Sequence, residues 1–147
     1  MIVEEFYDSI FYPAFKAYLE ANSAYEPIVT KKMPQESKKF PIVPVKLLPS
    51  TNTYNNLSYG EETYDFGIEI DIYSTDKTVD NKQVSKRTIS EEIVNTAIHY
   101  LKENYRFTIK IDRDAPNADS SIHRCNIRLT GKLDTKYGSD KLVIYPR

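Results

Sequence analysis

Hydrophobic and polar side chains alternate strictly along residues 64–74. The apolar positions are Tyr64, Phe66, Ile68, Ile70 and Ile72, and between them lie Asp65, Gly67, Glu69, Asp71 and Tyr73. Successive side chains of a strand point to opposite faces of a sheet. The stretch therefore predicts a strand with one apolar and one acidic face, in an antiparallel sheet that is covered on one side.

Segments 42–48, 107–112 and 122–133 also have the character of strands. Pro44 cannot donate to a ladder of hydrogen bonds, so we expect segment 42–48 to be an edge strand or to turn that nitrogen outward. Segment 122–133 carries His123, Cys125, Ile127 and Leu129 on one face, and Ile122, Arg124, Asn126, Arg128 and Thr130 on the other. Segment 141–145 is predicted to be a short final strand or an arm that pairs with a neighbour.

Two segments have the period of a helix. Residues 2–20 place one apolar stripe along the chain, made of Ile2, Val3, Phe6, Ile10, Ala14, Phe15 and Ala17. Because proline kinks or splits a helix, we expect a first segment to end near Tyr12 and a second to begin at Pro13. Residues 81–104, with Asp80 as the cap, carry a second stripe, made of Val84, Thr88, Ile89, Ile93, Ala97, Ile98, Leu101 and Tyr105.

The segments between these elements are polar and rich in turn residues. They predict a long loop at 22–39, with a short extended piece at Ile28 and Val29, and a long hairpin loop at 50–62. They also predict turns at 76–80 and 113–120 and a C-terminal arm at 133–147. The order of elements predicts a single α+β domain over residues 1–147. We expect an antiparallel sheet of about four strands, an amphipathic helix packed on one face, and an N-terminal helix.

Composition narrows the function. The net charge of -1 disfavours a protein that coats DNA or RNA by bulk charge. The chain holds 12 Tyr and no Trp, which fits either a protein interface or the β propensity of tyrosine. One cysteine, Cys125, leaves no intrachain disulfide, and no apolar run or basic leader predicts a membrane span or a signal peptide. We expect a soluble protein made in a reducing compartment.

Two sets of charged residues are candidate functional groups. Glu69 and Asp71 share a strand face with Asp65, and clustered carboxylates can hold Mg²⁺, here with help from Lys110 and Asp112. The other interpretation is a solvated or interface face of the sheet.

Arg124 and Arg128 also share a strand face, with Arg113 before the turn. They could contact phosphate or a partner's carboxylates, or they could pair with Glu69 and Asp71 across the same sheet. We take Glu69, Asp71, Arg124 and Arg128 as candidate subunit-interface residues.

Catalytic signatures are weak in this sequence. Cys125 has His123 two residues away on the same strand face, but a lone cysteine in an apolar stripe is far more often a small core residue. With 4 Gly in the chain there is no glycine-rich phosphate loop. We expect no catalytic residues, no metal site and no cofactor.

Three stretches resemble the tail terminator proteins of tailed bacteriophages, also called tail completion or neck proteins. They read EETYDFGIEIDIYS, NKQVSKRTISEEIVNTAIHYLKENYRF and DAPNADSSIHRCNIRLTG. The shared layout is a strand ending in an IYS-like triplet, an amphipathic helix, a turn with Pro-Asn and Asp, and a strand opened by SIHR. FPIVPVKLLP looks like the family's first sheet strand, so the likeness covers roughly residues 40–132.

The resemblance implies a structural role without catalysis or cofactor. Such proteins form rings, commonly hexamers, that cap the tail tube and join it to the head connector. The implied partners are copies of this chain, the tail tube protein and head–tail connector or adaptor proteins, in a virion whose parts are made in the bacterial cytoplasm. No membrane and no specific nucleic-acid sequence is expected, although the ring lumen leaves room for DNA. Asn117 and Asp119 match the family's turn, and Arg124 matches its strand.

Three alternatives stay open. A head–tail adaptor or stopper of the same neck would have the same structural character. A Mg²⁺-dependent nuclease would use Asp65, Glu69 and Asp71. A small adaptor would bind a peptide by strand addition at the edge of segment 42–48.

Overall fold

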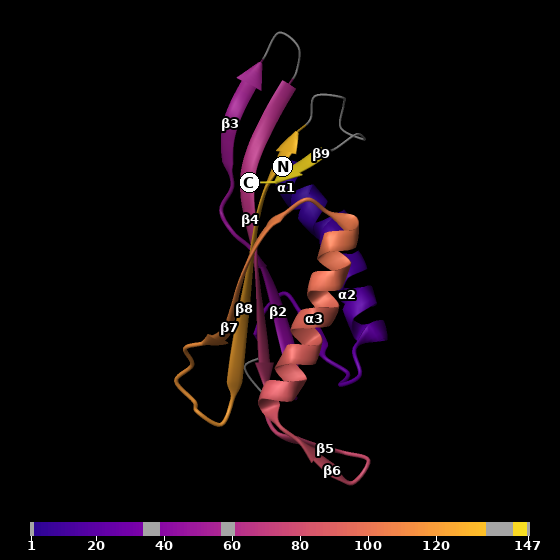
Figure 1. The fold of residues 1–147 in the computed structure, drawn as a ribbon. Coiled ribbons are helices and arrows are strands. Elements are labelled where there is room, and N and C mark those ends of the chain that lie inside the picture. The colour runs from indigo at the N-terminus through magenta and orange to yellow at the C-terminus, as the bar shows by residue number, and fades with distance from the viewer. Residues whose placement is uncertain (1, 34–38, 57–60, 135–142, 147) are drawn as a thin grey trace.

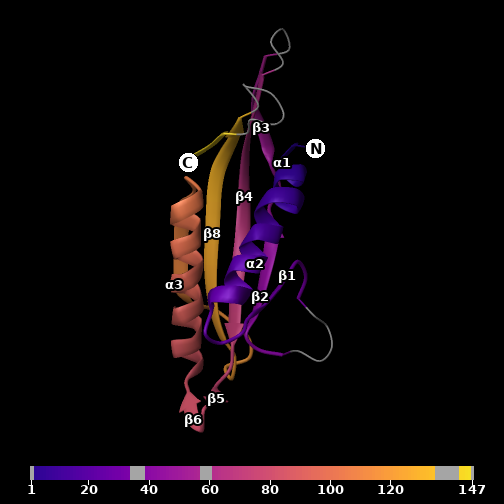
Figure 2. The ribbon, with the colours of Figure 1, turned by 90° about the vertical axis from the view of Figure 1, so that its right-hand side faces the viewer.

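The computed structural model describes residues 2–33, 39–56, 61–134 and 143–146. Figures 1 and 2 show two layers, a long twisted sheet and a layer of helices that lies against one of its faces. No helix of the described residues covers the other face. The architecture is α+β, as the order of the predicted elements indicates.

Five strands lie side by side in the sheet. Their order is β1 (Ile28–Thr30), β2 (Ile42–Leu47), β4 (Glu61–Ser74), β8 (His123–Asp134) and β7 (Thr108–Ala115). At one end of the long central strands, β3 (Thr51–Asn56) pairs with β4 and β9 (Val143–Pro146) pairs with β8. The β1–β2 pair is parallel and the other pairs are antiparallel. The predicted antiparallel sheet is confirmed, with more strands than expected.

The β4–β8 pair forms the centre of the sheet. Its register runs without a break from Thr63 opposite Asp134 to Ser74 opposite His123. The predicted apolar face of β4 is buried from Phe66 to Ile72, and it meets the buried face of β8 from Cys125 to Leu129. Each large apolar side chain buried in this way contributes roughly 1.5–3 kcal/mol.

Helix α3 (Lys86–Asn104) packs on this apolar face but begins later than predicted. Its cap is Ser85, whose side chain accepts from the backbone N–H of Thr88, and not Asp80. Asp80 and Asn81 have φ of 51° and 64°, the left-handed values that close a tight hairpin turn. They join β5 (Lys77–Val79) to β6 (Lys82–Val84), so the first part of the predicted helix is a two-stranded hairpin.

The N-terminal helix runs through Pro13 without the predicted split. It consists of α1 (Ile2–Glu5), a π-helical segment η1 (Phe6–Phe11) and α2 (Tyr12–Asn22). The N–H of Tyr12 donates to the carbonyl of Tyr7, five positions earlier, instead of the four of an α-helix. Pro13 then occupies the first turn of α2, where a missing N–H costs little.

The π-helical segment changes which side of this helix is buried. Phe6 and Phe11, five residues apart, both face the core, followed by Phe15 and Leu19 at the ordinary spacing of four. Ile10 is 48% exposed, so its predicted place in the core is wrong. Ala14 and Ala17, also expected in the buried stripe, are exposed.

Several predicted loops contain strands. The described part of loop 50–62 is a hairpin between β3 and β4, whose tip at 57–60 lies outside the described residues. The extended piece at Ile28 and Val29 is confirmed as β1, whereas residues 34–38 are not described. Within the predicted arm 133–147, residues 143–146 form β9 in the chain's own sheet, which confirms the short final strand expected at 141–145.

The β2 strand is not the free edge that Pro44 suggested. Its first half pairs with β1 from Ile42 to Pro44. In its second half the carbonyl of Val45 accepts a hydrogen bond of 2.8 Å from the Tyr7 hydroxyl. Peptide addition along this edge therefore has little free backbone to use.

Candidate functional site

The face of the sheet that no described helix covers is the candidate site, and we call it the open face. On β4 it presents Asp65, Gly67, Glu69, Asp71 and Tyr73, and opposite them β8 presents Lys132, Thr130, Arg128, Asn126 and Arg124. These positions alternate with the buried ones, as strand geometry requires. An acidic row and a basic row thus lie side by side along the middle of the molecule.

The two rows are joined by ion pairs within the chain. Arg124 donates to Asp71 through Nε and Nη2, each at 2.9 Å from Oδ1, and Asn126 donates to the same oxygen at 2.9 Å. Arg128 Nη2 lies 2.7 Å from Glu69 Oε2. The hydrogen bond from Arg128 and its charge hold the pKa of Glu69 below its usual value, against the opposing effect of burial.

The structure brings all four candidate interface residues together. Glu69 pairs with Arg128 and Asp71 with Arg124, which confirms the expectation of cross-strand pairing. Arg113, at the far end of β7, pairs instead with Glu91 on α3. Whether the four residues also contact another subunit stays a prediction.

The carboxylates that β4 presents on the open face are each engaged by a cation. Asp65 lies 3.5 Å from Lys132, and Glu69 and Asp71 have the arginine partners described above. In the described part of the chain no group of three or more His, Cys, Asp or Glu side chains is arranged to hold a metal ion. Asp112, a suggested helper, accepts from the backbone N–H of Asp114. This geometry gives the nuclease hypothesis little support.

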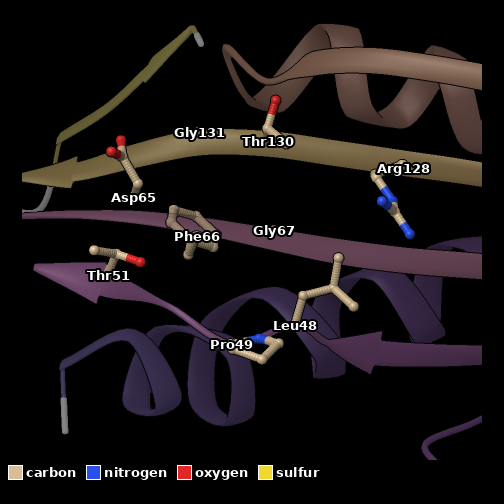
Figure 3. Close-up of a pocket in the computed structure, with 9 residues that line it drawn as sticks. All are labelled: Leu48, Pro49, Thr51, Asp65, Phe66, Gly67, Arg128, Thr130 and Gly131. Atoms are coloured by element: carbon tan, nitrogen blue, oxygen red, sulfur yellow. The ribbon is translucent and has the colours of Figure 1, made fainter.

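A shallow hollow interrupts the charged rows between the Glu69–Arg128 pair and the Asp65–Lys132 pair. The Leu48 side chain lies directly over the buried Gly67, and Pro49, Asp65 and Thr130 are among the other residues that line the hollow (Figure 3). Its volume is about 350 Å³. The hollow exists because β2 ends at Leu47 and the chain turns away into β3. Sequence reasoning missed it, although a glycine inside a strand signals a close approach or a gap.

A buried polar cluster lies on the opposite face, beneath the first turns of α3. His123 Nδ1 is 2.9 Å from the hydroxyl of Ser90, which in turn contacts the hydroxyl of Ser74. His123 Nε2 is 3.4 Å from the exposed carboxylate of Asp114. An Asp, a His and a Ser therefore lie near one another, but His123 Nε2 has no hydrogen-bond partner among the described residues, and Ser90 has no exposed surface with which to meet a substrate.

Cys125 is a core residue, as its place in an apolar stripe predicted. It is fully buried, and burial raises the pKa of its thiol to about 11. Its Sγ lies 3.9 Å from His123 Nδ1 and 3.1 Å from the carbonyl of Arg113. A thiol this buried and this weakly acidic has no nucleophilic role.

Comparison with protein-family models and with curated proteins found no match to this chain. Among the described helices none has the length and apolar character that crossing a bilayer requires. The class of molecule that fold and site define is a two-layer α+β protein with one open sheet face of paired charges.

Proposed function

We propose that this chain is a structural protein of a bacteriophage neck, a tail terminator that assembles into a ring, caps the tail tube and joins it to the head connector. The observation that carries the proposal is the open face. Strands of 14 and 12 residues, β4 and β8, are covered on one side by helices and on the other by no described helix. A face of that length suits contact with another protein surface.

The sequence likeness supports the same proposal. The stretches that resemble tail terminators form β4, α3 and β8, which are the centre of the sheet and the helix that packs on it. The shared layout thus corresponds to one continuous structural unit. A head–tail adaptor or stopper of the same neck has the same support.

The first test is the mass of the purified full-length chain over a range of concentrations. Light scattering after size exclusion should give one discrete multimer of the 17.1 kDa chain, with a hexamer as the expected species. A chain that stays at 17.1 kDa up to millimolar concentration contradicts the proposal.

The second test separates structure from catalysis. The chain is incubated with DNA and Mg²⁺, beside a Glu69→Ala, Asp71→Ala double variant as the matched control. We expect no cleavage by either protein. Cleavage by the parent that the double variant lacks contradicts the structural role and favours the nuclease.

A further inference from the structure

Closed rings need two different surfaces that meet, one from each of two neighbouring copies. We propose that the outer side of the N-terminal helix of one copy docks on the open face of the next, with Glu5 on a row of cations and Ile10 in the hollow that Leu48, Pro49 and Thr130 line. This inference rests on the proposed ring and names the surfaces that would build it.

The first argument is the character of the N-terminal helix. Its inner side is buried from Val3 to Leu19, yet its outer side also carries apolar residues, namely Ile10, Pro13, Ala14, Ala17 and Ala21, all of them exposed. Acidic residues lie among them, namely Glu4, Glu5, Asp8 and Glu20, so the outer side combines apolar and acidic groups. Ile10 is one of two large apolar side chains that are exposed among the described residues. The molecule's own core does not use this side.

The second argument is charge complementarity. Across the open face, the strand register sets Lys46 beside Glu69, Glu69 beside Arg128, and Arg128 beside Lys110. We call these residues the cation row, because it holds three cations, Lys46, Arg128 and Lys110, and one carboxylate, Glu69. The next register positions place Asp71 and Asp112 on either side of Asn126. Within the described residues Lys46 and Lys110 have no ion-pair partner, and both are exposed. The row therefore keeps a positive surplus that an acidic group of another copy can neutralise.

The acidic group that fits this row is Glu5. It is exposed, and the described part of the chain shows no ion pair for it. Because Phe6 and Phe11 share the buried side at a spacing of five, Glu5 and Ile10 share the outer side at the same spacing.

The third argument is distance. Five helical residues advance by roughly 7 Å, so Glu5 and Ile10 are about that far apart along the axis. On the sheet, Gly67 and Glu69 are two residues apart on β4, which is also roughly 7 Å. When Glu5 lies on the cation row, Ile10 can therefore reach the hollow beside Leu48 and Pro49.

The two surfaces lie on opposite sides of the molecule, one on the helix layer and one on the far face of the sheet (Figure 2). A contact between them leaves both surfaces of every ring member occupied, and repetition closes a ring when the rotation per copy permits it.

The test is a charge exchange between the two surfaces of the full-length chain. Self-association is measured by sedimentation velocity for Glu5→Lys, for Lys110→Glu and for the double variant. Each single change places like charges together and should weaken association by about tenfold or more, and the double variant should restore it. Lys46→Glu serves as a second reversal, and circular dichroism confirms that each variant is folded. Lys102→Glu, exposed on α3, is the matched control and should leave association unchanged.

The possible results distinguish a failure of the docking mode from a failure of the proposed ring. Rings that form equally well in the single variants overturn the docking mode and leave the proposed function standing. A parent chain that remains a monomer overturns both. Weakening without restoration in the double variant also overturns the pairing of Glu5 with the cation row.

Discussion

Asp71 gathers more polar contacts than any other carboxylate described on the open face. Its side chain is 15% exposed and takes donors from both Arg124 and Asn126 onto one oxygen. Asp65, farther along the strand, lies only near Lys132 at 3.5 Å and is 35% exposed. The two acids share a strand and a face but differ both in hydrogen bonding and in burial.

Asp71→Ala should lower the free energy of unfolding by about 1–2 kcal/mol, because Arg124 and Asn126 lose an acceptor in a half-buried setting. Asp65→Ala, the control, should cost less than about 0.5 kcal/mol. Urea unfolding at neutral pH measures both. Equal losses would show that the contacts of Asp71 do not stabilise the sheet.

Glu69 gives the open face a dependence on pH. Arg128 lowers the pKa of Glu69 in the folded chain below its ordinary value of 4.5. The stabilisation is therefore present above pH 4.5 and is lost as the pH falls through the folded value. Glu69→Gln removes this dependence, so the gap in stability between parent and variant should shrink between pH 7 and pH 3. A gap that is constant with pH would contradict the role of Arg128.

At the scale of elements, the π-helical segment decides which residues of the N-terminal helix are structural. Phe11→Ala should cost about 3–4 kcal/mol, because the side chain is fully buried among the rings of Phe15, Tyr105 and Phe107. Ile10→Ala should cost under about 0.5 kcal/mol in the dilute monomer. Thermal and urea unfolding compare the two. A large loss for Ile10 would mean that the helix is α-helical throughout and turned differently.

Ser85 fixes the start of α3. Ser85→Ala removes the acceptor for the N–H of Thr88 and should destabilise the chain by about 1 kcal/mol. Ser85→Asp keeps an acceptor and should retain most of the stability, as measured by denaturant unfolding. If alanine and aspartate behave alike, the cap lies elsewhere.

The elements that the sequence predicted well are those whose pattern reflects a buried surface. Apolar and polar side chains alternate along β4 and β8 because one face of these strands is packed against helices, and the alternation can be read in the sequence. The start of α3 was misplaced because residues 82–84 continue the helical spacing while the turn at Asp80 and Asn81 closes a hairpin. Pro13 did not split its helix. The turn before it is π-helical and contains one extra residue, so the helix accommodates a proline that has no backbone N–H.

The candidate site was predictable in part for the same reason. The pairing of Glu69 with Arg128 and of Asp71 with Arg124 follows from placing an acidic strand beside a basic one. The cation row was hidden because Lys46 and Lys110 reach it from outer strands whose register the sequence does not specify. The hollow was hidden because it depends on where β2 leaves the sheet.

At the scale of the whole molecule, the two sides of the sheet differ: helices cover one side, and no described helix covers the other. The helix layer and the open face are the two broad surfaces of the molecule, and they differ: the helix layer exposes Glu5 and Ile10, and the open face carries the cation row and the hollow. A ring protein needs two such different surfaces, and the described residues provide both.

Cysteine cross-linking between copies tests this account most directly. In a variant with Ile10→Cys and Thr130→Cys, the helix layer of one copy should form disulfides with the open face of the next, since buried Cys125 does not compete. The account predicts a ladder of covalent multimers of the 17.1 kDa chain on non-reducing gels, absent when Lys102→Cys replaces Ile10→Cys. A chain that migrates only at 17.1 kDa, or a ladder of equal strength in the control, would contradict it.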